Sequence, residues 1–121
     1  MSKELDKFGK FLMSNLRDNT ISKLNTLFEG GSKAPALQKL QNSMKSLKEE
    51  EKGILKKAFI NSLDSGLHDF LFSLHESTEN NEGIELIVNG KNIAELSDGL
   101  QGELFTKDGW LSKYSAYGEP S

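Results

Sequence analysis

Between Ser46 and Glu76 the chain reads SLKEEEKGILKKAFINSLDSGLHDFLFSLHE, the longest segment with one unbroken helical period. Apolar residues recur there at steps of three and four, and at 100° per residue they fall on one stripe. The stripe consists of Leu55, Phe59, Leu63, Leu67, Phe70, Leu71 and Leu74. We therefore expect a long helix that serves as the spine of the core.

Two further signals bear on the bounds of this helix. Ser46 followed by Glu49 fits a capping box, in which side chain and backbone bond reciprocally, so we expect the helix to begin near Leu47. Poor helix formers gather around Ser65, in the middle of the segment. They predict a kink or a break into two helices near that residue.

Two shorter amphipathic helices are expected before residue 32. The first runs from Lys3 to Arg17, with Arg17 among its polar positions. The residues at 18–20 are predicted to end it and to cap a second helix, whose apolar positions lie within residues 21–28. Gly30 and Gly31 should stop the second helix. The apolar face of the first helix is formed by Leu5, Phe8, Leu12 and Leu16.

A third short helix is expected to begin at Pro35. Proline suits the first turn of a helix because its missing N–H would have had no partner within the helix. Leu37, Leu40 and Met44 would give this helix a narrow apolar face. The long helix should follow directly.

The period changes from helix to strand after the polar loop at 77–83. Residues 84–88, IELIV, are rich in β-branched and apolar side chains, and residues 91–96, KNIAEL, can run back beside them. Asn89-Gly90 between them is the favoured two-residue type I′ turn. An isolated two-stranded hairpin is only marginally stable in water. We therefore expect this hairpin to pack against the helices or to gain a further strand from the tail or from another chain.

The last quarter of the chain is rich in turns but too apolar to be disordered. Short helical turns are expected at 100–105 and 110–115. We expect Trp110 to fill a gap between the hairpin and the long helix, and Tyr117 to stay at the surface.

These elements together predict one mainly α domain (α+β class) over residues 1–121, a helical bundle around a long helix with a C-terminal β-hairpin. A chain of 121 residues with 36% hydrophobic and 27% charged residues suits one soluble domain. No apolar run approaches the roughly 18 to 20 residues that span a bilayer, and the amino terminus lacks the pattern of a secretion signal. The chain has no cysteine. We therefore expect a cytoplasmic protein that does not bind membranes.

The net charge of −3 conceals an uneven distribution. Residues 1–63 sum to +5, whereas residues 64–121 sum to −8. The acidic half could present a negative surface to a basic partner. The alternative is that acidic loops only keep the protein soluble.

Two histidines on the long helix form the strongest chemical candidate. At 100° per residue, Asp64, His68 and His75 lie along one edge of the helix. Asp64 and His68 are one turn apart, as metal ligands on a helix must be, but His75 is too far along to share their ion. No serine or cysteine nucleophile accompanies the pair. We therefore expect boundary histidines bonded to water, backbone or neighbouring side chains, and predict no catalytic residue, no metal site and no cofactor.

Other classes of site are disfavoured by spacing. The glycines at 99, 102 and 109 lack the context of a phosphate-binding loop, and residues 98–108 offer too few oxygen ligands for calcium. Lysines line one edge of the long helix at 48, 52 and 56, but glutamates are interleaved with them, so no nucleic-acid partner is expected.

The segment LHDFLFSLHE, the hairpin and the closing DGLQGEL and DGWLSKYSAYG together resemble small bacterial immunity proteins of toxin and contact-dependent inhibition systems. The resemblance covers most of the chain as size and layout. It implies a stoichiometric inhibitor that docks an acidic surface over the active site of a basic toxin domain, possibly a nuclease. Such proteins share no catalytic signature, so the resemblance transfers no functional residue.

The charge distribution instead selects the candidate contacts with a basic protein partner. These partner-binding candidates are Glu76, Glu79, Glu82, Glu85, Glu95, Asp98, Glu103, Asp108 and Tyr117. Two alternatives stay open at this point. One is a homo-oligomeric regulatory or structural module, such as a homodimer paired through the hairpin edge, and the other is a small metal-binding protein that uses the helix histidines.

Overall fold

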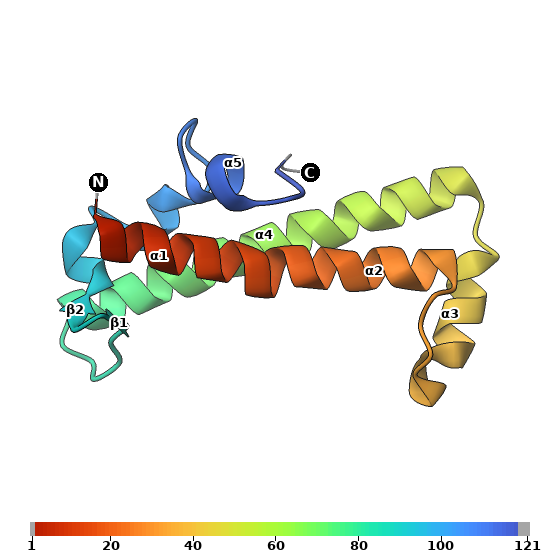
Figure 1. Ribbon diagram of the computed structural model, residues 1–121, viewed down its shortest axis with the longest axis horizontal. Helices are drawn as coiled ribbons and strands as arrows, with labels where there is room; N and C mark the ends of the chain where they lie inside the picture. Colours follow the sequence, from red (N-terminus) through yellow and green to blue (C-terminus); the bar gives the residue numbers. More distant parts are fainter. Residues whose placement is uncertain (1, 119–121) are drawn as a thin grey trace.

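Figure 1 shows the computed structural model, which describes residues 2–118. The α-helix α4 (Glu49–Glu79) is the spine. Against it runs an antiparallel helical rod composed of α1 (Lys3–Leu12), the π-helix η1 (Met13–Asp18) and α2 (Asn19–Glu29). The fold is mainly α with one β-hairpin near the C-terminus, which confirms the predicted class.

The bounds of α4 differ from those predicted. Lys48 is the N-cap, and its backbone N–H donates to the Glu51 carboxylate at 2.8 Å. Ser46 instead closes the preceding helix, and its hydroxyl donates to the Ser43 carbonyl at 2.8 Å. The break expected near Ser65 is absent, since α4 is continuous. Tertiary packing of the buried leucines that follow overrides the weak local propensity.

The first two predicted helices are not separate, because they form one continuous helical rod. Asp18 caps nothing, and the helical path continues through it as a π-helix, whose wider turn holds an extra residue. The Asp18 carboxylate instead accepts hydrogen bonds from the Ser115 hydroxyl at 2.5 Å and the Ala116 N–H at 2.8 Å. Gly30, in the left-handed conformation at φ 78°, ends α2 as predicted.

Arg17, predicted on a polar face, is fully buried. Its Nε donates to Asp64 Oδ1 at 2.7 Å, and a terminal nitrogen donates to Oδ2 at 3.2 Å. The other terminal nitrogen donates to the Ser115 hydroxyl at 3.0 Å and the Tyr117 carbonyl at 2.5 Å. One guanidinium thus joins the rod, α4 and the C-terminal segment.

Helix α3 (Gln38–Lys45) follows a short 3-10 helix, η2 (Pro35–Leu37), at the end of the molecule away from the hairpin. Pro35 occupies the first turn of η2, as expected. The predicted apolar face is only partly buried, because Met44 is buried whereas Leu37 and Leu40 are exposed. A buried amide, Gln41, holds the preceding loop through hydrogen bonds at 2.7 and 3.2 Å to the backbone of residue 32.

The hairpin is shorter than predicted. Strands β1 (Ile87–Val88) and β2 (Lys91–Asn92) pair antiparallel around the Asn89-Gly90 turn. Positive φ angles of 49° and 79° at these two residues confirm the type I′ geometry. The second strand ends early because the Asn92 side chain accepts from the Ala94 N–H at 3.1 Å and starts the 3-10 helix η3 (Ile93–Leu96).

The C-terminal quarter completes the core with the 3-10 helix η4 (Leu100–Glu103) and the helix α5 (Trp110–Tyr114). Trp110 is 2% exposed, so its predicted burial is confirmed. Its ring lies against α1 rather than in a gap between hairpin and α4, in edge-to-face contact with Phe8 at 5.7 Å between centroids.

The core is concentrated at the hairpin end of the molecule. It comprises Leu5, Leu12, Met13, Leu67, Leu71, Leu74, Ile93, Ala94, Leu100, Leu104, Trp110 and Leu111. At the other end, α2 and the first half of α4 bury little besides Ile21 and Leu24. The predicted spine is therefore a core face only in its second half, and Leu55 at its start is 39% exposed.

A prediction follows from the contact of Trp110 with Gly9. A methyl group at Gly9 would lie 2.4 Å from ring atoms of Trp110, so Gly9→Ala should lower the free energy of unfolding by about 1–3 kcal/mol. Gly53→Ala is the matched control. It adds the same methyl to an exposed helix position with nothing within 4 Å and should stabilise by about 0.5–1 kcal/mol. Urea unfolding measures both, and a neutral Gly9→Ala would contradict this packing.

A second prediction concerns the buried ion pair. Asp64→Ala leaves the Arg17 charge buried without its carboxylate and should cost about 3–5 kcal/mol, whereas the double variant Arg17→Met, Asp64→Leu should cost less. Asp69→Ala, at an exposed aspartate on the same helix, should change stability by no more than about 0.5 kcal/mol. Urea unfolding measures the stability of all three variants. A double variant less stable than Asp64→Ala would refute the explanation that the unpaired buried charge of Arg17 causes the loss of stability.

Candidate protein-binding surfaces

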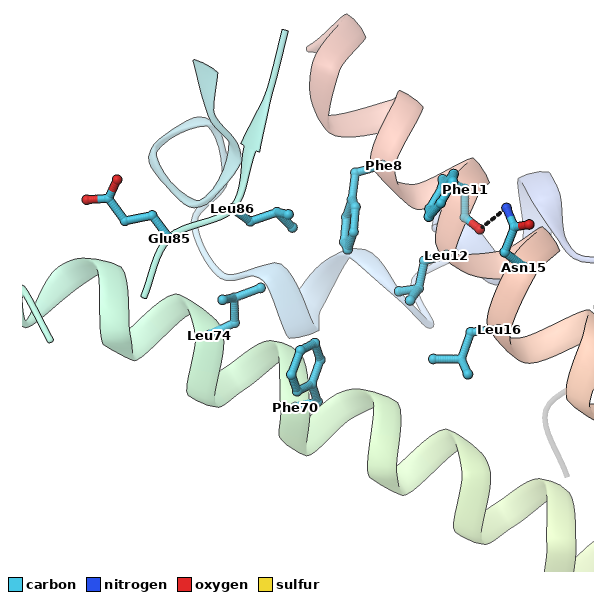
Figure 2. A pocket seen from close by; sticks show the side chains of 9 residues that line it. All are labelled: Phe8, Phe11, Leu12, Asn15, Leu16, Phe70, Leu74, Glu85 and Leu86. Carbon is cyan, nitrogen blue, oxygen red and sulfur yellow. Dashed lines mark hydrogen bonds between the residues drawn. The ribbon is translucent and has the colours of Figure 1, made fainter. Parts of the chain in front are cut away.

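An apolar groove runs between the N-terminal half of the rod and α4 (Figure 2). It has a volume of about 350 Å³. Phe8 and Phe11 face it from α1, and Phe70 and Leu74 face it from α4. The residues that line it are Phe8, Phe11, Leu12, Asn15, Leu16, Phe70, Leu74, Glu85 and Leu86. We call it the Phe11–Phe70 groove.

Large side chains in the Phe11–Phe70 groove are unusually exposed. Phe11 is 64% exposed and Phe70 is 58% exposed. Leu16, predicted on the core face, is 44% exposed because the π-helix directs its neighbour Arg17 inward instead. Adjoining exposed apolar side chains of this size make the groove a candidate interaction surface.

A second surface gathers six of the predicted carboxylates. They lie at the end of α4, in the loop that follows it, beside the hairpin, and in or just after η3, and all are exposed. Figure 1 shows that these elements share one end of the molecule. We call this surface the acidic end, formed by Glu76, Glu79, Glu82, Glu85, Glu95 and Asp98.

The other three predicted contacts lie in different settings. Glu103, half-buried in η4, accepts from the Ser97 hydroxyl at 2.6 Å. Asp108 is exposed on the loop before α5. Tyr117 is half-buried, and its carbonyl accepts from Arg17 beside η1 rather than at the acidic end.

The helix histidines have separate structural settings. His75 is buried, and its Nδ1 accepts from the Leu100 N–H at 3.2 Å, so Nε2 carries the proton and donates to Glu79 at 2.8 Å. His68 lies near the surface, 3.2 Å from Asp69. The Asp64 carboxylate forms an ion pair with Arg17. Among residues 2–118 no group of three potential metal ligands converges.

Two features of these surfaces escaped sequence reasoning. In the sequence Arg17 lies four residues after Met13 and four residues before Ile21, so the three side chains share one side of the helical rod. Met13 and Ile21 are both buried. This spacing was the signal that Arg17 points into the core. Phe11 is not part of the apolar stripe predicted for the first helix. A large aromatic side chain outside that stripe was the signal that an exposed apolar surface lies beside it.

Comparisons with protein-family models, curated proteins and solved structures found no match to this chain. Within the part of the chain that is described, no helix is both long enough and apolar enough to cross a bilayer.

An ion pair attaches the hairpin to α1. Lys91 Nζ lies 3.1 Å from Glu4 Oε1, and this hydrogen bond lowers the pKa of the Glu4 carboxyl below its ordinary value of 4.5. When folding lowers the pKa of a carboxyl group, that group stabilises the folded state at pH values above the pKa it has in the unfolded chain. That contribution is lost as the pH falls through the lowered pKa.

We therefore predict that Lys91→Met raises the pKa of Glu4 towards its ordinary value, and that any stability difference from the parent chain shrinks in acid. Carbon-detected NMR titration of the Glu4 carboxyl measures the first effect. Lys113→Met, which removes a lysine 3.8 Å from Asp6, should leave the pKa of Glu4 unchanged. Equal pKa values of Glu4 in the parent and Lys91→Met chains would contradict the assignment.

Proposed function

We propose that this protein is a binding protein that neutralises a basic toxin domain by docking the acidic end over the toxin's active site. The observation that carries the proposal is the exposure of six carboxylates on adjoining elements at one end of the molecule. Clustered like charges raise the potential above the surface and steer an oppositely charged partner into contact.

The setting of the acidic end supports this proposal. Lys91, the lysine of the hairpin, is paired with Glu4 and so does not neutralise the cluster. Glu79 is bonded to His75, which fixes its side chain in place. A partly fixed set of acceptors loses less conformational entropy on binding than free side chains do.

The charge also favours one class of toxin. A nuclease needs a positively charged surface to bind the phosphate backbone of its substrate. A cluster of carboxylates presents similar charge and similar hydrogen-bond acceptors. A nuclease domain is therefore the toxin class that best complements the acidic end, and the protein acts by occlusion rather than by catalysis.

The test begins with identification of the partner. The tagged chain is used to capture proteins from its native lysate at low and high salt, and the captured protein is then purified and assayed with and without this protein. We expect one basic partner, bound stoichiometrically, released by salt and inhibited on binding. A partner that keeps full toxic activity in the complex would overturn the proposal.

Charge reversal then tests the surface. Replacing Glu82, Glu95 and Asp98 by Lys should weaken capture of the purified partner at least about tenfold, because attraction becomes repulsion. The control reverses three exposed glutamates elsewhere, Glu29, Glu49 and Glu50, with the same change in net charge. Isothermal titration calorimetry measures both, and equal affinities would exclude the acidic end as the binding surface.

A further inference from the structure

We infer that Ile84 and Ile87 are the apolar anchors of the acidic end. They fill an apolar hollow on the basic toxin domain, and the carboxylates of the acidic end form a polar rim around that contact. The inference rests on the proposed function, because it concerns the same surface and the same partner. It adds the side chains that keep the complex together after charge has brought the two proteins into contact.

Both isoleucines are largely exposed. Ile84 is 63% exposed and Ile87 is 51% exposed, although isoleucine is among the residues most often buried completely. Only two residues separate them, so their Cα atoms lie no more than about 11 Å apart even in an extended chain. One surface of a partner can therefore cover both side chains.

The register of the hairpin explains why Ile87 faces outward. Residues that pair across two strands project from the same face, and neighbours along a strand project from opposite faces. Val88 pairs with Lys91, whose Nζ lies 3.1 Å from Oε1 of Glu4, so their face lies towards α1. Ile87 and its partner Asn92 therefore project from the other face, away from α1.

Glu85 shares the outward direction of Ile87. It lies two residues before Ile87, and the residue between them, Leu86, packs against the core. Figure 2 shows the side chains of Glu85 and Leu86 pointing in opposite directions. A carboxylate and an exposed isoleucine thus project together from the outer surface of the hairpin segment.

The backbone of Ile84 is fixed to α4. The hydroxyl of Ser77, a buried residue near the end of that helix, donates to the Ile84 carbonyl at 3.1 Å and accepts from the Ile84 N–H at 3.3 Å. The branched side chain itself has few χ1 rotamers. Ile84 therefore has little conformational freedom to lose on binding, which favours it as an anchor.

The charges around the isoleucines select a basic partner. Residues 76–98 carry six carboxylates and one lysine, Lys91, which already has a carboxylate partner. Glu82 lies two residues before Ile84, and Glu85 lies between the two isoleucines. A lysine or arginine of the partner can cover isoleucine with its alkyl stem while its charged end meets a carboxylate. A second copy of the same acidic surface would be repelled instead.

Anchors and rim act on different steps of binding. Charges at the rim steer the approach, so they set the association rate constant and its dependence on salt. Apolar side chains act at short range, after water has been displaced, so they set the dissociation rate constant. Kinetic measurements can therefore separate the contribution of the two isoleucines from that of the surrounding carboxylates.

Surface plasmon resonance with the purified basic protein captured from the native lysate tests the anchors. For the double variant Ile84→Thr, Ile87→Thr we expect dissociation at least about tenfold faster than for the parent chain. The association rate constant should stay within about twofold of the parent value at each salt concentration. Threonine keeps the β-branched shape and removes the apolar end of the side chain.

The matched control is Ile54→Thr. Ile54 is 65% exposed in the first half of α4, at the end of the molecule away from the hairpin (Figure 1). This variant should leave both rate constants unchanged. The triple charge reversal at residues 82, 95 and 98 should instead lower the association rate constant. Circular dichroism verifies that every variant folds.

The possible outcomes separate this inference from the proposed function. Equal dissociation rates of the parent and the double variant, or an equal effect of Ile54→Thr, would overturn the inference and leave the acidic end as the binding surface. Capture of no basic protein would overturn both. A captured protein that keeps its toxic activity in the complex would refute only the proposed inhibition. A parent chain that dimerises in sedimentation velocity, together with a double variant that does not, would overturn the inference by assigning the isoleucines to a second copy.

Discussion

The buried contact between Arg17 and Asp64 is the constraint on which the rest of the structure depends. It joins residues 47 positions apart, and the same guanidinium reaches the backbone carbonyl of Tyr117, 100 positions away. A charge withdrawn from water is tolerable only where its hydrogen bonds are made in full. The π-helix supplies the geometry, because its additional residue turns Arg17 inward while Asp18 holds residues 115 and 116.

This constraint also shapes the outer surface. Once Arg17 points inward, Leu16 is left at the groove, beside Phe11 and opposite Phe70. The groove and the acidic end therefore occupy different parts of the molecule, apart from Glu85.

Sequence reasoning succeeded where local chemistry decides the outcome and failed where distant segments compete. The Asn89-Gly90 turn, the stop at Gly30 and the place of Pro35 follow from backbone preferences of single residues. The break expected near Ser65 did not occur, because packing of the neighbouring leucines outweighs local propensity. The helix end and cap expected within residues 18–20 were wrong, because the helical path is continuous there and the Asp18 carboxylate bonds to the chain almost 100 residues later. For the candidate surfaces, composition located the acidic carboxylates but gave no sign that Tyr117 lies apart from them.

By itself, the sequence determined the helical class, the position of the hairpin and the excess of acid in the second half, because periodicity, turn residues and charge are local properties. Only the tertiary structure decided which apolar residues remain exposed. A stripe on a helix indicates a preferred side but not how much of its length another element covers. Leu67 and Leu71 in the second half of α4 are buried, whereas Leu55 at the start of the same stripe is not. The reason is physical: burial depends on the second surface, and the chain provides one for only half of α4.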